Sequence, residues 1–126
     1  MGGTPIELTQ ANFKSVVEAD GIVIVDWWAP WCGPCRGFAP VFEAVAMKHA
    51  DITFGKVNTE QEQELAKVFE IRSIPTVMVL RDQVVLFVQP GTLPEAGLDD
   101  IIRQVRALDM SVIKAQLAAE QQKAPK

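Results

Sequence analysis

The chain has 126 residues, of which 48% are hydrophobic and 22% are charged, and its formal net charge is −4. This size and composition indicate one soluble globular domain, and the acidic balance argues against nucleic acid or an anionic membrane surface as a partner. Residues 1–5 lack the basic and apolar segments of a secretion signal, and no apolar run is as long as a membrane span, so we expect a cytoplasmic protein.

The first part of the chain predicts a short strand, a helix and then a buried strand. Thr9 can cap a helix that continues to about Ala19, and Leu8 and Phe13 occupy the two positions of a hydrophobic staple. Residues 22–28 form a β-branched and aromatic run without alternation. Such a run is typical of a central strand that is covered on both faces.

A second helix is predicted directly after the two cysteines of the chain, Cys32 and Cys35. Pro34 suits its first turn, where the N–H that proline lacks would have no partner within the helix. An apolar stripe continues to about Ala50. Pro40 falls inside this stripe and should kink the helix.

Three further strands are expected where β-branched and aromatic residues gather, at 52–57, 76–80 and 84–88. A capping box at Thr59 should start a helix that ends near Phe69. Residues 81–83 join the last two strands into a hairpin without the favoured glycine. A second capping box, at 92–95, should start the last main helix.

This order predicts an α/β fold with a mixed sheet of five strands flanked by helices on both faces. Strands that alternate with helices imply parallel crossovers, whereas the hairpin adds antiparallel strands. We expect residues 1–107 to form the domain, residues 108–121 a helical extension, and residues 122–126 a tail without fixed structure.

The extension has two interpretations. Apolar residues recur at three- and four-residue steps from Leu98 onward, which suits one long helix with a coiled-coil seam. Alternatively the main helix ends near Leu108, Asp109 caps a second helix, and its apolar residues pack back onto the domain. Those residues are Val112, Ile113 and Leu117. We favour the second interpretation because the seam weakens to alanines.

The two cysteines predict a redox pair. A bridge that closes so short a loop constrains the unfolded chain little, so a structural staple is disfavoured. Cys32 lies at a helix start, where free N–H groups and the helix dipole stabilise a thiolate. Cys35 is one turn further, shielded by Trp31 and the strand beneath. We therefore expect Cys32 to attack a substrate disulfide and Cys35 to resolve the mixed disulfide.

Asp26 is the candidate proton acceptor for the resolving step. A carboxylate within the apolar run 22–28 is costly to bury in its charged form, so its pKa should rise toward neutrality. Lys56, on the next strand along the chain, could tune that pKa. The alternative is that Asp26 only lies at a hydrated strand end.

No metal or cofactor is expected. A CxxC pair can form half of a zinc site, but a structural zinc site needs four ligands and His49 is the only further candidate. His49 lies near a predicted helix end, where a surface role is simpler. Neither flavin nor nicotinamide is expected to bind, since the chain has no Gly-rich phosphate loop.

Several motifs, in order and at compatible spacing, resemble the thioredoxin family. They are Val25-Asp26-Trp27-Trp28-Ala29, Trp31-Cys32-Gly33-Pro34-Cys35, Ala39-Pro40, Lys56-Val57-Asn58, Ile74-Pro75-Thr76 and Gly91. The resemblance implies the thioredoxin fold and protein-disulfide reduction. It implies Cys32 as nucleophile, Cys35 as resolving thiol and Asp26 as buried proton acceptor near Lys56. It also implies a cis peptide bond before Pro75.

The resemblance further implies a substrate groove and partners. The groove would be bordered by Trp31, Gly33, Pro34, Ile74, Pro75 and Gly91, and the backbone of residue 74 would pair with an extended peptide. The implied partners are disulfide-containing proteins and an NADPH-dependent flavin reductase. We expect the protein itself to be a monomer. Ser73 and Pro90 depart from the family pattern beside this groove. They leave open a second hypothesis, a binding module or co-chaperone that uses the groove and the extension.

Overall fold

A mixed sheet of five strands, in the order β1-β3-β2-β4-β5, forms the centre of the computed structural model, which describes residues 4–123. The strands are β1 (Ile6–Glu7), β2 (Ile22–Trp28), β3 (Thr53–Asn58), β4 (Thr76–Arg81) and β5 (Val84–Pro90). β1, β3 and β2 run parallel to one another, whereas β4 is antiparallel to β2 and β5. The predicted mixed sheet is confirmed.

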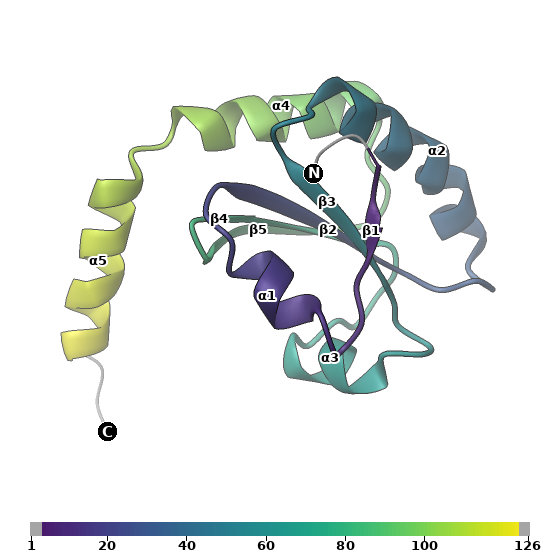
Figure 1. The fold of residues 1–126 in the computed structure, drawn as a ribbon, viewed down its shortest axis with the longest axis horizontal. Coiled ribbons are helices and arrows are strands. Elements are labelled where there is room, and N and C mark those ends of the chain that lie inside the picture. Colours follow the sequence, from purple (N-terminus) through teal and green to yellow (C-terminus); the bar gives the residue numbers. More distant parts are fainter. Residues whose placement is uncertain (1–3, 124–126) are drawn as a thin grey trace.

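Helices cover both faces of the sheet, as predicted (Figure 1). They are α1 (Phe13–Val17), α2 (Gly33–Lys48), α3 (Gln63–Val68), α4 (Glu95–Ala107) and α5 (Met110–Lys123). α2 and α4 lie over one face, and α1 and α3 lie over the other. Among the described residues, no helix is long and apolar enough to cross a membrane.

The side chains of β2 alternate between two cores. Ile22 and Ile24 pack against α2 and α4, whereas Val23, Val25 and Trp27 pack on the side of α1 and α3. Because successive strand residues point to opposite faces, the even-numbered residues that follow Ile24 belong to the face covered by α2. This alternation directs Asp26 and Trp28 toward the helix that carries the cysteines.

The predicted helix start at Thr9 is wrong. α1 begins at Phe13, and its N-cap residue is Asn12. The backbone N–H of Thr9 donates to Oδ1 of Asn12 at 2.7 Å, and that of Phe13 donates to the carbonyl oxygen of Thr9 at 2.9 Å. These bonds form a turn ahead of the helix, so the helix starts later than its capping residue predicted.

The two predicted capping boxes are also wrong. The backbone N–H and the hydroxyl of Thr59 both donate to the carbonyl oxygen of Trp28, at 2.8 and 3.0 Å. The hydroxyl of Thr59 is therefore bonded to the end of β2 and does not cap a helix, and α3 begins only at Gln63. α4 begins at Glu95 behind Pro94, without a side-chain cap from Thr92.

The β4–β5 hairpin turns through two residues in the left-handed region. Asp82 has φ 51° and Gln83 has φ 71°, the combination that a two-residue hairpin of type I′ requires. Oδ1 of Asp82 accepts the N–H of Gly21 at 2.9 Å, and the Gln83 side-chain amide donates to the carbonyl oxygen of Glu18 at 2.7 Å. These bonds hold a turn that lacks glycine.

The extension forms a second helix, as the favoured interpretation predicts. Oδ1 of Asp109 accepts the backbone N–H groups of Ser111 and Val112, at 3.0 and 3.4 Å. α4 ends at Ala107, and α5 continues to Lys123, beyond the predicted end at residue 121. The rest of the predicted tail, residues 124–126, lies outside the described residues.

The predicted packing of the extension against the domain is wrong for Val112 and Leu117, although Ile113 is half-buried. Val112 is 49% exposed and Leu117 is 40% exposed, whereas Met110, at the start of α5, is buried. In Figure 1, α5 turns down from the end of α4 and lies at the left of the view, apart from the sheet. Its apolar residues are spread around the helix instead of forming one inward stripe.

Candidate functional site

The two cysteines form a disulfide at the N-terminus of α2. Their Cα atoms are 5.2 Å apart, and Cys32 is the N-cap residue of the helix. The backbone N–H of Cys35 donates to Sγ of Cys32 at 3.2 Å. When the bridge is open, this N–H and the positive end of the helix dipole would stabilise a thiolate at Cys32 more than at Cys35.

Both cysteines are buried in a small apolar cluster. Their side chains are 5% and 2% exposed, and they pack with Ala29, Trp28 and Ile74. Trp31 is 68% exposed, so the prediction that it shields Cys35 is wrong. The shielding comes from Trp28 at the end of β2, from Ala29 directly after it, and from Ile74.

A second segment is held beside the disulfide. Sγ of Cys32 lies 3.8 Å from the carbonyl oxygen of Ile74, and the peptide bond between Ile74 and Pro75 is cis. The carbonyl oxygen of Pro75 accepts the N–H of Gly91 at 2.8 Å. Gly91 has φ 90°, a conformation that favours glycine. The structure thus brings Ile74, Pro75 and Gly91 together next to Cys32.

The remaining groove residues lie at the surface around the nucleophile. Trp31, Gly33 and Pro34 are exposed, and they precede or form the first turn of α2. The predicted groove residues therefore occupy two adjoining regions, one at the start of α2 and one in the loops that precede β4 and follow β5. Their contact with substrate stays a prediction.

Asp26 has no exposed surface, so the alternative that it lies at a hydrated strand end is wrong. On β2 it falls between Ile24, which packs in the core under α2, and Trp28, which packs against the cysteines. Neither carboxylate oxygen has a hydrogen-bond partner among the described residues. Burial raises the pKa of Asp26 to about 7, although the positive charge of Lys56 lowers it.

Lys56 is the register neighbour of Asp26 on β3. Its Nζ lies 4.8 Å from the centroid of the Trp28 ring, a distance at which a cation is attracted to the ring face. Lys56 therefore lies beside both the buried carboxylate of Asp26 and the ring of Trp28, which packs on the cysteines.

Replacing Lys56 with methionine should raise the pKa of Asp26 above about 7, because the opposing positive charge is lost while the burial remains. NMR titration of the Asp26 carboxyl carbon in the oxidised protein measures this shift. Lys14→Met is a matched control, since Lys14 is an exposed residue of α1 on the other face of the sheet. An unchanged or lower pKa in Lys56→Met would show that Lys56 does not act on Asp26.

His49 lies away from the cysteines, at the C-cap of α2. Its Nε2 is 3.0 Å from Oδ1 of Asp99, and Lys48 bonds both Asp99 and Glu95 on α4. These contacts tie the end of α2 to α4, in keeping with the expected surface role. Among the described residues, no three His, Cys, Asp or Glu side chains are grouped as metal ligands.

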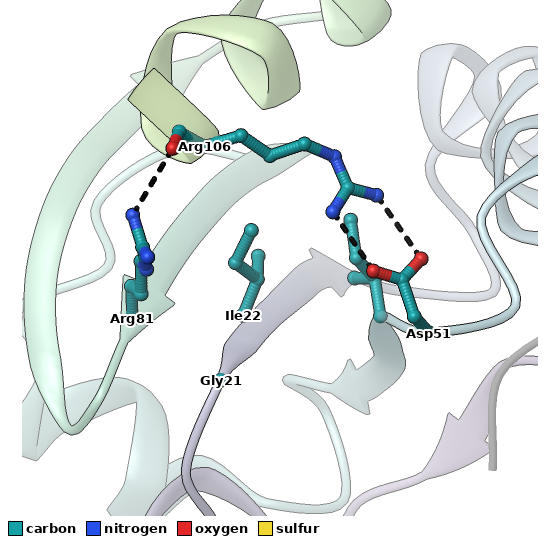
Figure 2. A pocket seen from close by; sticks show the side chains of 6 residues that line it. Gly21, Ile22, Asp51, Arg81 and Arg106 are labelled. Atoms are coloured by element: carbon teal, nitrogen blue, oxygen red, sulfur yellow. Dashed lines mark hydrogen bonds and ion pairs between the residues drawn. The ribbon is translucent and has the colours of Figure 1, made fainter. Parts of the chain in front are cut away.

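A polar pocket lies at the opposite end of β2 from the disulfide (Figure 2). Arg106 binds both carboxylate oxygens of Asp51, at 2.8 and 3.0 Å. Nη1 of Arg81 donates to the carbonyl oxygens of Val105 and Leu108, at 2.8 and 3.1 Å. These charged groups are paired with one another or with backbone carbonyl oxygens, and they hold the end of α4 in place. We therefore interpret the pocket as structural.

The sequence of the chain is similar to those of known thioredoxins. The thioredoxin family model matches residues 4–104. A thioredoxin-type protein from Streptomyces coelicolor is 50% identical over 119 residues, covering 94% of this chain and 89% of that protein. A match of that extent includes most of α5. The thioredoxin of Alicyclobacillus acidocaldarius is 41% identical over 101 residues, covering 76% of this chain and 96% of that protein.

Solved structures match in the same way. A mutant thioredoxin from Halobacterium salinarum superposes with a TM-score of 0.79 at 28% sequence identity, covering 86% of this chain and 96% of that chain. A chloroplastic thioredoxin z superposes with a TM-score of 0.77 at 25% identity, covering 86% of this chain and 99% of that chain. The predicted fold and the predicted family are confirmed.

Proposed function

The chain belongs to the thioredoxin family and is a protein-disulfide reductase, and from that premise we propose the roles of its site residues. The observation that carries the proposal is the disulfide at the start of α2, on the same face of the sheet as a buried carboxylate with a raised pKa. This arrangement supplies a nucleophile, a resolving thiol and a proton acceptor.

In the first step, the Cys32 thiolate attacks one sulfur of a substrate disulfide. A bond forms between Sγ of Cys32 and that sulfur, the substrate S–S bond breaks, and the second substrate sulfur leaves as a thiolate. The N-cap position of Cys32 and the N–H of Cys35 support this role, because they favour negative charge on Sγ before the attack.

In the second step, Cys35 gives its proton to Asp26 and attacks Sγ of Cys32. The bond that forms is the Cys32–Cys35 disulfide present in the structure, and the first substrate sulfur is released. Two electrons have then passed from the dithiol to the substrate, which ends as two thiols. The buried carboxylate supports this step because a pKa of about 7 lets it both accept and release a proton near neutrality.

Substrate binding is assigned to Trp31, Gly33, Pro34, Ile74, Pro75 and Gly91. The carbonyl oxygen of Ile74 lies close to Sγ of Cys32, which supports the pairing of this backbone with an extended substrate segment. Recognition of that kind adds a strand-like peptide through main-chain hydrogen bonds. The attacked disulfide would then lie against the exposed first turn of α2.

The implied partner for recycling is an NADPH-dependent flavin reductase, which would return the Cys32–Cys35 disulfide to the dithiol. Family membership supports this partner. A reducing compartment such as the cytoplasm suits the activity, because thiols are kept reduced there. We assign the protein to that compartment as a monomer. The binding-module alternative is not advanced, since binding alone does not need a redox-active pair.

Reduction of insulin in the presence of NADPH and a thioredoxin reductase tests the proposal. We expect steady NADPH consumption that depends on the protein, and none above background for Cys32→Ser. Equal rates for the two proteins would remove Cys32 from the mechanism. No consumption by the unaltered protein, with a reductase that reduces its disulfide, would contradict the reductase function.

A further inference from the structure

A surface pocket of about 560 Å³ lies between the first half of α2 and the segment that joins β5 to α4. Its lining is apolar or small apart from one hydroxyl: Pro34, Gly37, Phe38, Val41, Thr92, Leu93 and Pro94. The four residues of α2 follow the spacing i, i+3, i+4, i+7, so they form one face of the helix. No charged side chain lines this pocket.

The pocket adjoins the redox pair. Pro34 lies between Cys32 and Cys35 in the chain and also forms one wall of the pocket. Any protein whose disulfide reaches Cys32 must therefore lie close to the pocket mouth. The pocket includes none of the other proposed groove residues, so it would add a contact that the groove does not supply.

Gly37 lies inside α2, where glycine is unfavourable compared with alanine. Gly37 is exposed, its φ is not positive, and a Cβ atom placed on it would meet nothing within 4 Å. Neither backbone conformation nor close packing therefore requires glycine at this position. A longer side chain here would lean toward the helix N-terminus, over Pro34, and cover the pocket.

We propose that this pocket accepts one bulky apolar side chain of the substrate protein, close to its disulfide, and that Gly37 keeps the pocket open. The proposal rests on the proposed function, because only disulfide exchange at Cys32 brings a substrate to this place. The uncharged lining favours an aliphatic or aromatic side chain over a charged one. The volume lies within the range of pockets that hold ligand groups.

Disulfide-cyclised peptides test the proposal. The peptides carry either leucine or serine one, two or three residues after a cysteine and are otherwise identical. The fully reduced protein is mixed with each, and its oxidation is followed by stopped-flow tryptophan fluorescence. We expect a leucine peptide to react about tenfold faster than its serine partner, as burial of an apolar side chain would produce.

In Gly37→Leu the ratio of the leucine-peptide rate to the serine-peptide rate should fall close to one. Thr92→Phe should also lower this ratio, because the phenylalanine fills the pocket from the side opposite α2. Glu43→Leu adds the same side chain to an exposed position of α2 outside the pocket and should keep the ratio. A ratio near one in the unaltered protein, or an unchanged ratio in both pocket variants, would overturn the inference. Reduction of cystine by the unaltered protein distinguishes failure of the pocket proposal from failure of the proposed function. If the protein reacts with neither cystine nor any peptide, the proposed function is overturned.

Discussion

Cys35→Ser should retain the first step of the reaction and lose the second. The Cys32 thiolate can still attack a substrate disulfide, but the adduct has no neighbouring thiol to release it. We expect steady turnover of insulin to fall to the background rate, because each protein molecule stops at the mixed disulfide. The variant should accumulate as a mixed disulfide with a substrate chain.

Mass spectrometry under non-reducing conditions measures that adduct after mixing with insulin. The matched variant is Cys32→Ser, which should form no adduct, because Cys35 is shielded within α2 and has a less favourable position for a thiolate. Adduct formation by Cys32→Ser, together with none by Cys35→Ser, would reverse the two roles. The experiment therefore tests whether Cys32 and Cys35 have different roles, as their positions at the helix N-terminus predict.

The strands and the redox pair could be predicted because their determinants are local. The run 22–28 marks a buried strand through its own composition, and it forms β2 over those same residues. Asp26 differs from the rest of that run because it is a carboxylate among apolar residues, and the same difference predicts its raised pKa. Local sequence therefore contains most of the information on the centre of the site.

Helix starts could not be predicted as well, because their capping residues bind partners from elsewhere. Thr59 follows the capping pattern, yet the end of β2 occupies its hydroxyl. The same limit applies to the pocket beside α2. Gly37 and Thr92 come together only because the β5–α4 segment lies beside α2 in the folded protein, and no local sequence pattern indicates that contact.

The extension shows a different limit. Val112 and Leu117 are apolar, and a sequence pattern alone suggests that such residues will be buried. Burial also needs a neighbouring surface, and the direction in which α5 leaves α4 decides whether one is within reach. That direction depends on Leu108 and Asp109, between two helices whose lengths were predicted only approximately.

Asp26→Asn should make the protein more stable and less active. Below the ordinary pKa of 3.8 the carboxyl is protonated in both the folded and the unfolded chain; between 3.8 and about 7 only the folded protein keeps the proton. The stability contributed by this bound proton is complete below pH 3.8 and is lost as the pH rises through 7. At about 1.4 kcal/mol for each pKa unit, the loss amounts to roughly 4 kcal/mol.

Asparagine cannot ionise, so the variant should avoid this loss. At pH 8 we expect its free energy of unfolding to exceed that of the unaltered protein by up to about 4 kcal/mol, and the two values to converge below pH 4. Urea unfolding of the oxidised proteins between pH 3 and 9 measures the difference. Glu60→Gln, which removes an exposed carboxylate, is the control. Equal pH dependence for Asp26→Asn and the unaltered protein would show that Asp26 does not hold a proton near neutrality.

The same substitution should slow the attack of Cys35 by about 10²-fold, the lower end of what a positioned proton acceptor contributes. Single-turnover release of substrate from the mixed disulfide, followed between pH 5 and 9, should lose its inflection near pH 7. If Asp26→Asn keeps that inflection, another group accepts the proton. Opposite effects on stability and rate would explain why a carboxylate without a hydrogen-bond partner among the described residues occupies the core. It destabilises the fold above neutrality, and the resolving step depends on the proton that it can accept.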